Sequence, residues 1–437
     1  MIRLDAWPAR AQFRPGERAA LRVVAHGDRG ARMGILARCS EGGRSRGDTA
    51  PREIALDDDG YGELCLSLDL PLTDRERAAY AVEVGVVGGT EEARTTTALD
   101  VAPHWSVAPR YGFLCDFPPD EPERETVRRA DALARLHLNV VQCYDWMATH
   151  HTFLPDADPF VDPLGRRMSH ATLRRLVSRC RERGIATLAY GALYGAEREF
   201  SDAHESWLLY GPDGSALHLA ERFYLQDPSP GSPWREWILG QYEEAVRALA
   251  FDGIHIDQYG FPKRALSRAT GQWREVDLAQ VFPGFVEEAC RRVRELAPTS
   301  GNIFNCVNAW PLEALRPVQG DAATYIEVWE PHTRYRDLYE LARRARSLRP
   351  TKPVILAAYL APFGATSRSA GALTAFRLAF AAISASGATQ LIAGEDGAVL
   401  TEGYYPRYAR LDGPEFGVVR RSYDFLVRNG PILLEMP

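Results

Sequence analysis

The 437-residue sequence lacks any apolar run of the ~20 residues that a bilayer-spanning helix needs. Its first residues, MIRLDAWPARAQFRPGERAA, contain no apolar core of a signal peptide. We therefore expect no membrane partner. The expected location is cytoplasmic if Met1 is the native start, and extracellular if a leader was removed.

An excess of positive charge is also missing, because 58 Asp and Glu residues outnumber 52 Lys and Arg residues. Proteins that bind nucleic acid need basic surfaces to neutralise phosphates, so we expect no such partner. The cysteines number seven, and no two form a C-x-x-C pair. This argues against a zinc site and against a dense disulfide framework.

What is present begins with short apolar runs in residues 1–105, at 20–24, 34–38, 62–68 and 79–87. Turn residues separate them: PGE at 15–17, DDDG at 57–60 and GG at 88–89. Several short strands at regular spacing predict a small immunoglobulin-like β-sandwich. A chain of this length usually holds more than one core, so a second domain is expected.

Residues 106–437 show a different pattern, in which apolar strands alternate with amphipathic helices. The predicted strands are 111–116, 139–145, 185–190, 251–257, 302–308, 324–329, 353–359 and 389–393. Eight strand–helix units predict a (β/α)8 TIM barrel. The rival is a doubly wound open sheet, which would normally show a glycine-rich phosphate turn after its first strand. CDFPPDEPE supplies none.

The ends of these strands carry mainly carboxylates and aromatic residues. The active site of a TIM barrel lies at the strand ends, so these side chains are candidates for substrate binding and catalysis. Carboxylates that attack or protonate, with aromatic faces beside them, are what sugar chemistry requires. The candidates are Asp116, Tyr144, Asp145, Tyr190, Asp257, Asn308, Glu327, Trp329, Tyr359, Glu395 and Asp396, with His150 and His151 after the second strand.

Asp257 is the leading candidate, because FDGIHIDQYG is an apolar strand that should stop at its second aspartate. A charged group at the end of a buried strand is costly unless it faces a polar cavity. A helix cap or an ion pair with arginine is the structural alternative. Glu327 is the best partner, since alternation in YIEVWE puts it on the inward face. Glu330, just past the strand, is its competitor.

The other candidates have structural alternatives that the sequence leaves open. Asp145 could bind sugar hydroxyls or orient His150. A structural role for either neighbouring histidine is open as well. Asp116 could cap a helix. Among the tryptophans, Trp329 is favoured as a stacking platform, because it follows the acid candidate directly.

Several long motifs together resemble the dextranase family, glycoside hydrolase family 66. They are YGFLCDF, NVVQCYDWMATHH, PFVDPLGR, TLAYGALYGA, FDGIHIDQYG, NCVNAWP and YIEVWEP, and they cover residues 110–430. The resemblance implies enzymes that act on α-1,6-linked glucan with retention of configuration, either endo-dextranases or cycloisomaltooligosaccharide glucanotransferases. It also implies an immunoglobulin-like domain before the barrel. The family's nucleophilic aspartate falls on Asp257 and its acid/base glutamate on Glu327. Tyr144 and Asp145 match the element beside the sugar in the cleavage subsite.

The sequence departs from the family pattern at several places. Gly191 stands where a polar residue is expected, and Gln226 and Asp227 lie near an expected asparagine. Family members usually continue into a C-terminal β domain, whereas this sequence stops at PILLEMP. Cyclising members insert a carbohydrate-binding module after strand seven. Here only residues 360–369 are available, which favours hydrolysis.

The expected reaction is therefore retaining endo-hydrolysis of an α-1,6-glucan by double displacement, with neither a metal nor an organic cofactor. The alternatives are a transglycosylase, a hydrolase of another α-glucoside, and a barrel that binds carbohydrate without cleaving it. The expected partner in each case is an α-glucan or an oligosaccharide.

Overall fold

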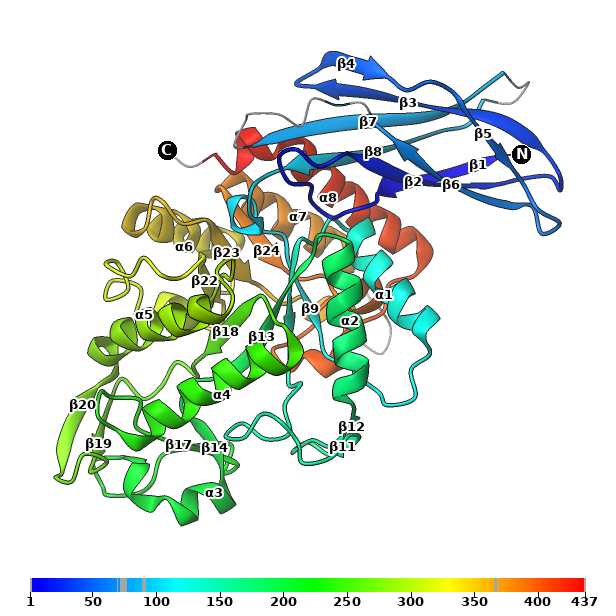
Figure 1. Ribbon diagram of the computed structural model, residues 1–437. Coiled ribbons are helices and arrows are strands. Elements are labelled where there is room, and N and C mark those ends of the chain that lie inside the picture. Colours follow the sequence, from blue (N-terminus) through cyan, green and yellow to red (C-terminus); the bar gives the residue numbers. More distant parts are fainter. Residues whose placement is uncertain are drawn as a thin grey trace.

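The centre of the molecule is an eight-stranded parallel sheet whose strands follow one another in chain order (Figure 1). The computed structural model describes residues 2–68, 70, 77–88, 92–364, 368 and 370–435. The strands are β9 (Tyr111–Leu114), β10 (Val140–Cys143), β13 (Ala186–Ala192), β18 (Gly253–Asp257), β21 (Ile303–Asn305), β22 (Ala323–Glu327), β23 (Val354–Ala357) and β24 (Ala388–Leu391). A parallel bridge from Phe113 in β9 to Gly394 beyond β24 nearly closes the ring. The barrel prediction is thus confirmed, and the doubly wound alternative is excluded because the strand order never reverses.

An α-helix follows every barrel strand but one, and these helices surround the barrel. They are α1 (Glu123–Arg135), α2 (His170–Glu182), α4 (Pro233–Leu249), α5 (Leu278–Leu296), α6 (Tyr335–Leu348), α7 (Ala372–Ala385) and α8 (Gly413–Leu433). Local sequence fixes several of their starts. The Ser169 hydroxyl accepts from the amides of Ala171 and Thr172 at the start of α2, and Asp412 and Glu415 form a capping box on α8.

The fifth unit corrects the expectation of eight strand–helix pairs. Between β21 and β22, all residues from 306 to 322 are described, and they form the short 3-10 turn η3 (Val307–Ala309) and further turns with no α-helix. The sequence PLEALRPVQG at 311–320 carries two prolines in this stretch. Proline removes a backbone donor and clashes with the preceding turn, which explains why a helix does not form here.

Two antiparallel sheets precede the barrel and enclose a hydrophobic core of their own. One sheet holds β1 (Arg3–Pro8), β2 (Ala20–His26) and β6 (Tyr61–Ser67), and the other β3 (Arg32–Glu41), β4 (Arg44–Asp48), β5 (Arg52–Ala55), β7 (Ala78–Val87) and β8 (Arg94–Val101). All four runs predicted as strands are strands, while β1, β4, β5 and β8 were not predicted. The immunoglobulin-like identity of this unit and its boundary at residue 105 stay predictions. The last residue of the predicted GG turn, Gly89, lies outside the described residues.

The two units meet along α8, which lies beneath β7 and β8 (Figure 1). At the junction, the guanidinium of Arg110 is buried against Asp100, with a nitrogen–oxygen distance of 2.8 Å. The same side chain donates to the carbonyls of Ala11 and His137. A buried charge is tolerated only when it is paired and hydrogen-bonded, and here the linker residue Arg110 meets both conditions.

Insertions after the strands gather at the end of the barrel away from the N-terminal sheets (Figure 1). They comprise β11 (Phe160–Val161), β12 (Arg167–Met168), β14 (Gly195–Glu197), α3 (Arg198–Ala203), β15 (Leu209–Tyr210), β16 (His218–Leu219), β17 (Phe223–Leu225), β19 (Arg264–Ser267) and β20 (Arg274–Asp277). These loops follow the carboxyl ends of the strands, so they build the rim of the face where TIM barrels place their active sites.

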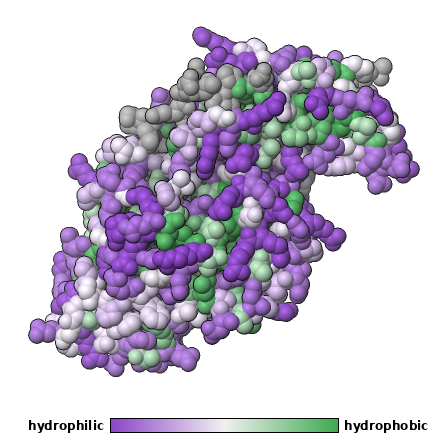
Figure 2. Space-filling model, in the orientation of Figure 1, coloured by the Kyte–Doolittle hydropathy of each residue, from purple (hydrophilic) through white to green (hydrophobic). Residues whose placement is uncertain are grey.

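Most of the molecular face seen in Figure 2 is hydrophilic, with apolar side chains showing between the helices and on the N-terminal sheets. Within the described ranges, no helix combines the length and the apolar character that crossing a bilayer would take.

Candidate active site

A cavity of about 580 Å³ opens at the carboxyl ends of the barrel strands. This volume lies within the range typical of small-molecule sites. Both predicted catalytic carboxylates line it, together with five of the predicted binding residues: Tyr144, Asp145, His150, Tyr190 and Trp329. A sixth, Tyr359, reaches the site through its hydrogen bond to Glu327. The other wall comes from residues in the inserted loops, including Leu219, Phe223, Tyr404 and Tyr405.

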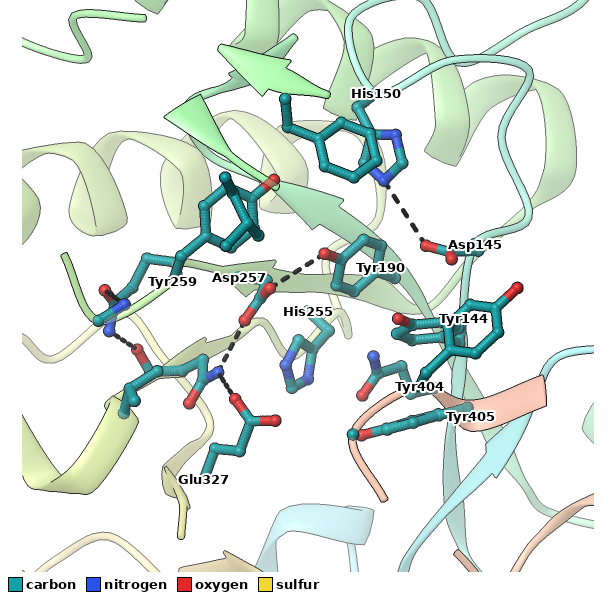
Figure 3. Close-up of a pocket in the computed structure, with 18 of the residues that line it drawn as sticks. Tyr144, Asp145, His150, Tyr190, His255, Asp257, Tyr259, Glu327, Tyr404 and Tyr405 are labelled. Carbon is teal, nitrogen blue, oxygen red and sulfur yellow. Dashed lines mark hydrogen bonds and ion pairs between the residues drawn. The ribbon is translucent and has the colours of Figure 1, made fainter. Parts of the chain in front are cut away.

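Asp257 and Glu327 face each other across this cavity (Figure 3). Asp257 is the last residue of β18, as the strand pattern predicted, and Glu327 is the last of β22, which ends two residues before the predicted end at 329. Glu330 is exposed and lies outside the cavity lining. The geometry therefore favours Glu327 over its competitor, in agreement with the inward-facing alternation.

A single amide nitrogen joins the two carboxylates. Asn305 Nδ2 donates to Asp257 Oδ1 at 2.7 Å and to Glu327 Oε2 at 2.9 Å. The two oxygens can be no further apart than these two distances end to end, 5.6 Å. Retaining glycosidases hold their carboxyls about 5–5.5 Å apart, and inverting ones ~6.5–9.5 Å. The gap in this site fits the retaining class.

Two tyrosine hydroxyls complete the hydrogen bonding of the pair. Tyr190 donates to Asp257 Oδ2 at 3.0 Å, and Tyr359 donates to Glu327 Oε1 at 2.6 Å. Each of the four carboxylate oxygens thus accepts a hydrogen bond from a neutral donor. No guanidinium or ammonium group contacts the pair among the described residues, so nothing in the site neutralises either carboxylate permanently.

Burial and the negative charge of Glu327 raise the pKa of Asp257 to about 7, against the hydrogen bonds from Asn305 and Tyr190, which favour the charged form. Two carboxyls this close cannot both ionise cheaply, so near neutral pH the pair holds one proton between them. One carboxylate and one carboxylic acid is the combination that a nucleophile and a general acid require.

An ion cluster forms the wall beside this pair. His150 Nε2 lies 3.6 Å from Asp145 Oδ1, and its Nδ1 lies 3.0 Å from Glu197 Oε1. Burial alone would lower the pKa of His150, but the hydrogen bonds to Asp145 and Glu197 outweigh it and raise the pKa to about 9. His150 is therefore an imidazolium near neutral pH, and it holds Asp145 at the cavity edge (Figure 3).

Aromatic rings line much of the remaining surface. Tyr144 stacks on Tyr405 with ring centroids 4.3 Å apart, and Trp329 meets Tyr359 edge to face at 5.6 Å. Trp329 stays 44% exposed at the rim, so its face is available to a ligand. Rings of this kind pack well against the apolar faces of sugars.

Five of the predicted binding residues lie outside the cavity. Asn308 sits in η3, where its side chain accepts from the Trp329 amide and donates to the Glu330 carbonyl. His151 bonds Glu197 on the far side of the ion cluster. The remaining three, Asp116, Glu395 and Asp396, surround a separate hollow of about 380 Å³ between α1 and the segment after β24.

In that second hollow, arginines pair with Glu395 and Asp396, while Asp116 accepts a hydrogen bond from the Tyr408 hydroxyl. Arg129 reaches Glu395 Oε1 at 2.5 Å and Glu121 Oε2 at 2.6 Å, and Asp396 pairs with Arg128 and Arg410. Possible ligand atoms of Cys115, Asp116 and Glu395 lie within 4.8 Å of one another. The guanidinium of Arg129 already provides the positive charge that a metal ion would bring there.

The cavity also contains residues that the sequence interpretation missed. Asn305 was passed over because the fifth strand was expected to run to residue 308, whereas β21 ends at Asn305. His255 is two residues before Asp257 and shares its inward face, a signal that alternation could have supplied. Burial lowers its pKa to about 3, and its Nδ1 lies 2.8 Å from the Tyr111 hydroxyl. Tyr404 and Tyr405 come from the segment after β24, where no periodicity marks them. Glu197, which bonds His150 beside the cavity, ends the short strand β14 in the insertion after β13.

The residues that depart from the family pattern, Gly191, Gln226 and Asp227, lie at positions that support the barrel. A side chain on Gly191 would meet Tyr242 at 2.7 Å and Phe153 at 3.2 Å, so only glycine fits there. Gln226 donates to Ser201, and Asp227 accepts from Ser267 and Arg274. These contacts stabilise the insertion after β13 and contribute no side chain to the cavity lining.

The sequence profile of glycosyl hydrolase family 66 matches residues 9–435. The chain belongs to this family. The resemblance predicted from the motifs is therefore confirmed over nearly the whole chain. Two curated relatives of this family 66 chain are cycloisomaltooligosaccharide glucanotransferases from Niallia circulans. One is 24% identical over 371 residues, which is 80% of this chain and 37% of the relative. The other is 26% identical over 310 residues, or 66% and 31%.

A solved structure has the same fold as this family 66 chain. It is a Paenibacillus sp. cycloisomaltooligosaccharide glucanotransferase complexed with cycloisomaltoheptaose, with a TM-score of 0.87 and 18% identity. The match covers 99% of this chain and 82% of that one. Against the two curated relatives, the chain spans only about a third of their length.

Proposed function

We propose that this protein is a retaining glycoside hydrolase that cleaves α-1,6-linked glucan internally. The observation that carries the proposal is the pair of carboxyls, Asp257 and Glu327, held at most 5.6 Å apart by the Asn305 amide. Family membership supports the same class of chemistry, and relatives named for isomaltooligosaccharides support an α-1,6-linked substrate.

In the proposed mechanism, Asp257 attacks the anomeric carbon while Glu327 protonates the departing glycosidic oxygen. The carbon–oxygen bond to the leaving sugar breaks, and a glycosyl ester forms on Asp257. Glu327, now a carboxylate, takes a proton from water as the water oxygen attacks the anomeric carbon from the face opposite Asp257. The bond between that carbon and the Asp257 oxygen breaks, and Asp257 leaves as a carboxylate. The product has the substrate's anomeric configuration, and Glu327 is protonated again for the next cycle. The reaction needs no redox or group-carrying cofactor.

The assignment of the two roles follows the family resemblance, which puts the nucleophile on Asp257 and the acid/base on Glu327. Asp257 accepts from Asn305 and Tyr190, and these donors favour its ionised form. Trp329, two residues after Glu327, lies towards the open rim of the cavity. A leaving group or a water molecule reaches the site from that side.

We assign substrate binding to the cavity wall. Asp145, fixed by the imidazolium of His150, offers a carboxylate to sugar hydroxyls at the cleavage position. Tyr144 and Trp329 offer ring faces to the glucose units. The walls supply both hydrogen-bond acceptors and apolar rings, as a pyranose requires.

Glycosyl transfer is the second candidate, and the names of the curated relatives favour it. The first half of the mechanism is identical, and a sugar hydroxyl replaces water in the second half. The segment between Ala357 of β23 and Ala372 of α7 is short, which favours hydrolysis; residues 365–367 and 369 in it lie outside the described residues.

The testing experiment is a thin-layer product screen over dextran, pullulan, amylose and isomaltooligosaccharides of defined length. The proposal expects a ladder of isomaltooligosaccharides from dextran and no products from amylose. Cyclic or elongated products would show that the enzyme transfers the glycosyl group to a sugar hydroxyl and not to water. Binding of isomaltooligosaccharide without any product after long incubation would overturn the enzymatic proposal in favour of a carbohydrate-binding barrel.

A further inference from the structure

Asn305 lies between the two carboxylates at the end of β21, the strand that separates β18 from β22. Its side chain is buried, with 2% of its surface exposed. Its NH2 group faces Asp257 and Glu327, and it donates one hydrogen bond to each.

The backbone of Asn305 is hydrogen-bonded as well as its side chain. Gln258, the residue after the attacking carboxylate, donates from Nε2 to the Asn305 carbonyl at 3.0 Å. The Oε1 of the same amide accepts from the Gly260 amide at 2.7 Å. Gln258 is itself buried. The strand end that carries Asn305 is thus tied directly to the turn that follows Asp257.

We propose that Asn305 is the positioning residue that sets the gap between Asp257 and Glu327 and keeps that gap in the retaining range. This inference rests on the proposed function, since it assigns the reason for the stereochemistry. A single nitrogen that donates to both carboxylates limits their separation to 5.6 Å. The tyrosines cannot do this, because each hydroxyl donates to one of the two carboxylates, Tyr190 to Asp257 and Tyr359 to Glu327.

The same two hydrogen bonds have an electrostatic effect. A donor to a carboxylate favours its charged form, so Asn305 opposes the rise in the pKa of Asp257 that burial and Glu327 cause. Removing the amide should then make Asp257 harder to ionise. Because the acid limb of kcat/KM reports the group that must be ionised in the free enzyme, the limb should move upward.

The test compares Asn305→Ala with Asn308→Ala. Both substitutions remove an amide from the same segment, but Asn308 bonds only the backbone of Trp329 and Glu330. For Asn305→Ala we expect kcat on dextran to fall about 100-fold and the acid limb to rise by about one pH unit. For Asn308→Ala we expect a higher KM and an unmoved acid limb.

A second readout needs no substrate. Between pH 4 and pH 9, Tm should fall as the buried pair ionises. Asn305→Ala raises the pKa of Asp257, so the Tm of this variant should go on falling to a pH about one unit higher than in the wild type. Asn305→Asp, which preserves the side-chain volume, guards against a simple packing defect and should move the acid limb further, because it adds a third carboxylate.

An unmoved acid limb together with an unmoved thermal titration in Asn305→Ala would overturn the inference. That result would leave the proposed function standing, provided that the wild-type protein cleaves dextran with retention. If the wild-type protein cleaves no glucan, the proposed function fails, and the thermal titration still decides whether Asn305 controls the pair.

Discussion

Two carboxylate-rich hollows lie at the same end of this barrel, and they differ in what surrounds the acids. In the proposed catalytic cavity, Asp257 and Glu327 face each other, and their hydrogen-bond donors among the described residues are neutral. In the hollow beside α1, Glu395 and Asp396 are paired with arginines. Burial raises the pKa of Glu395 too, but the charge of Arg129 opposes that rise, whereas no cation opposes the raised pKa of Asp257 among the described residues. We expect reactive chemistry to depend on the partners of a carboxylate and not on its place at a strand end.

The sharpest way to break this comparison is to neutralise one acid in each hollow. Asp257→Asn removes the nucleophile, and we expect kcat/KM on dextran to fall at least about 10⁴-fold because no covalent intermediate can form. Asp116→Asn changes an acid that contacts only the Tyr408 hydroxyl through its side chain, and activity should stay within about tenfold.

Initial rates of dextran cleavage by both variants test this expectation, and circular dichroism checks that both variants fold. Glu327→Gln and Glu330→Gln form a second matched pair, in which only the former should lose most of its activity. Equal losses in Asp257→Asn and Asp116→Asn would erase the distinction between the two hollows.

Replacing Arg129 in the second hollow should lower stability more than activity. Arg129→Ala leaves Glu395 and Glu121 without their buried partner, and loss of one member of a buried pair costs about 3–5 kcal/mol. The neighbouring Arg128 is half exposed, so Arg128→Ala should cost under about 1 kcal/mol. Urea unfolding midpoints of the two variants measure the difference. A similar small loss in both would show that the buried arginine is not needed to hold these acids.

The contribution of the Asp257–Glu327 pair to the free energy of unfolding should instead fall as pH rises. The pKa of Asp257 is about 7 in the folded protein, above its ordinary 3.8, so folding favours the protonated form. The stabilising contribution is complete below pH 3.8 and is lost as pH rises towards 7. Asp257→Asn removes this loss.

The difference in Tm between Asp257→Asn and the wild type should therefore grow from near zero at pH 4 to a maximum above pH 7. The gain in unfolding free energy is at most about 4 kcal/mol. A difference that is constant with pH, or that shrinks as pH rises, would contradict the burial of an ionisable pair.

The smallest expected effect concerns the rim. Trp329→Ala removes a ring that lines the cavity, and we expect KM for dextran to rise about tenfold with little change in kcat. Trp273, which is 56% exposed at the turn between β19 and β20, is the matched control and should leave KM unchanged when it is replaced by alanine. Equal KM values in the two variants would remove Trp329 from the binding surface.

The sequence was sufficient to predict the barrel and the two facing carboxylates, because both depend on local regularities. Apolar strands of a parallel sheet read as continuous runs, and alternation separates Glu327 from Glu330. Asp257 ends its strand where the apolar run ends. These features need no knowledge of distant contacts.

The remaining predictions depended on contacts between segments far apart in the chain. Asn308 was predicted at the end of the fifth strand, but β21 ends at Asn305, because strand ends are set by pairing with β18 and β22. Nothing near Glu395 in sequence shows that Arg129 neutralises it from α1. Tyr404, Tyr405 and Glu197 lie in the insertions that follow the barrel strands, so the periodicity of the barrel elements could not identify them.

The central claim is that Asp257 and Glu327 act across a short gap by double displacement. Proton NMR of the first sugar released from an isomaltooligosaccharide, recorded before mutarotation, tests it most directly. The account predicts that the new reducing end appears first as the α-anomer. A β-anomer as the first product would contradict it, because that outcome requires water to attack directly across a wider gap.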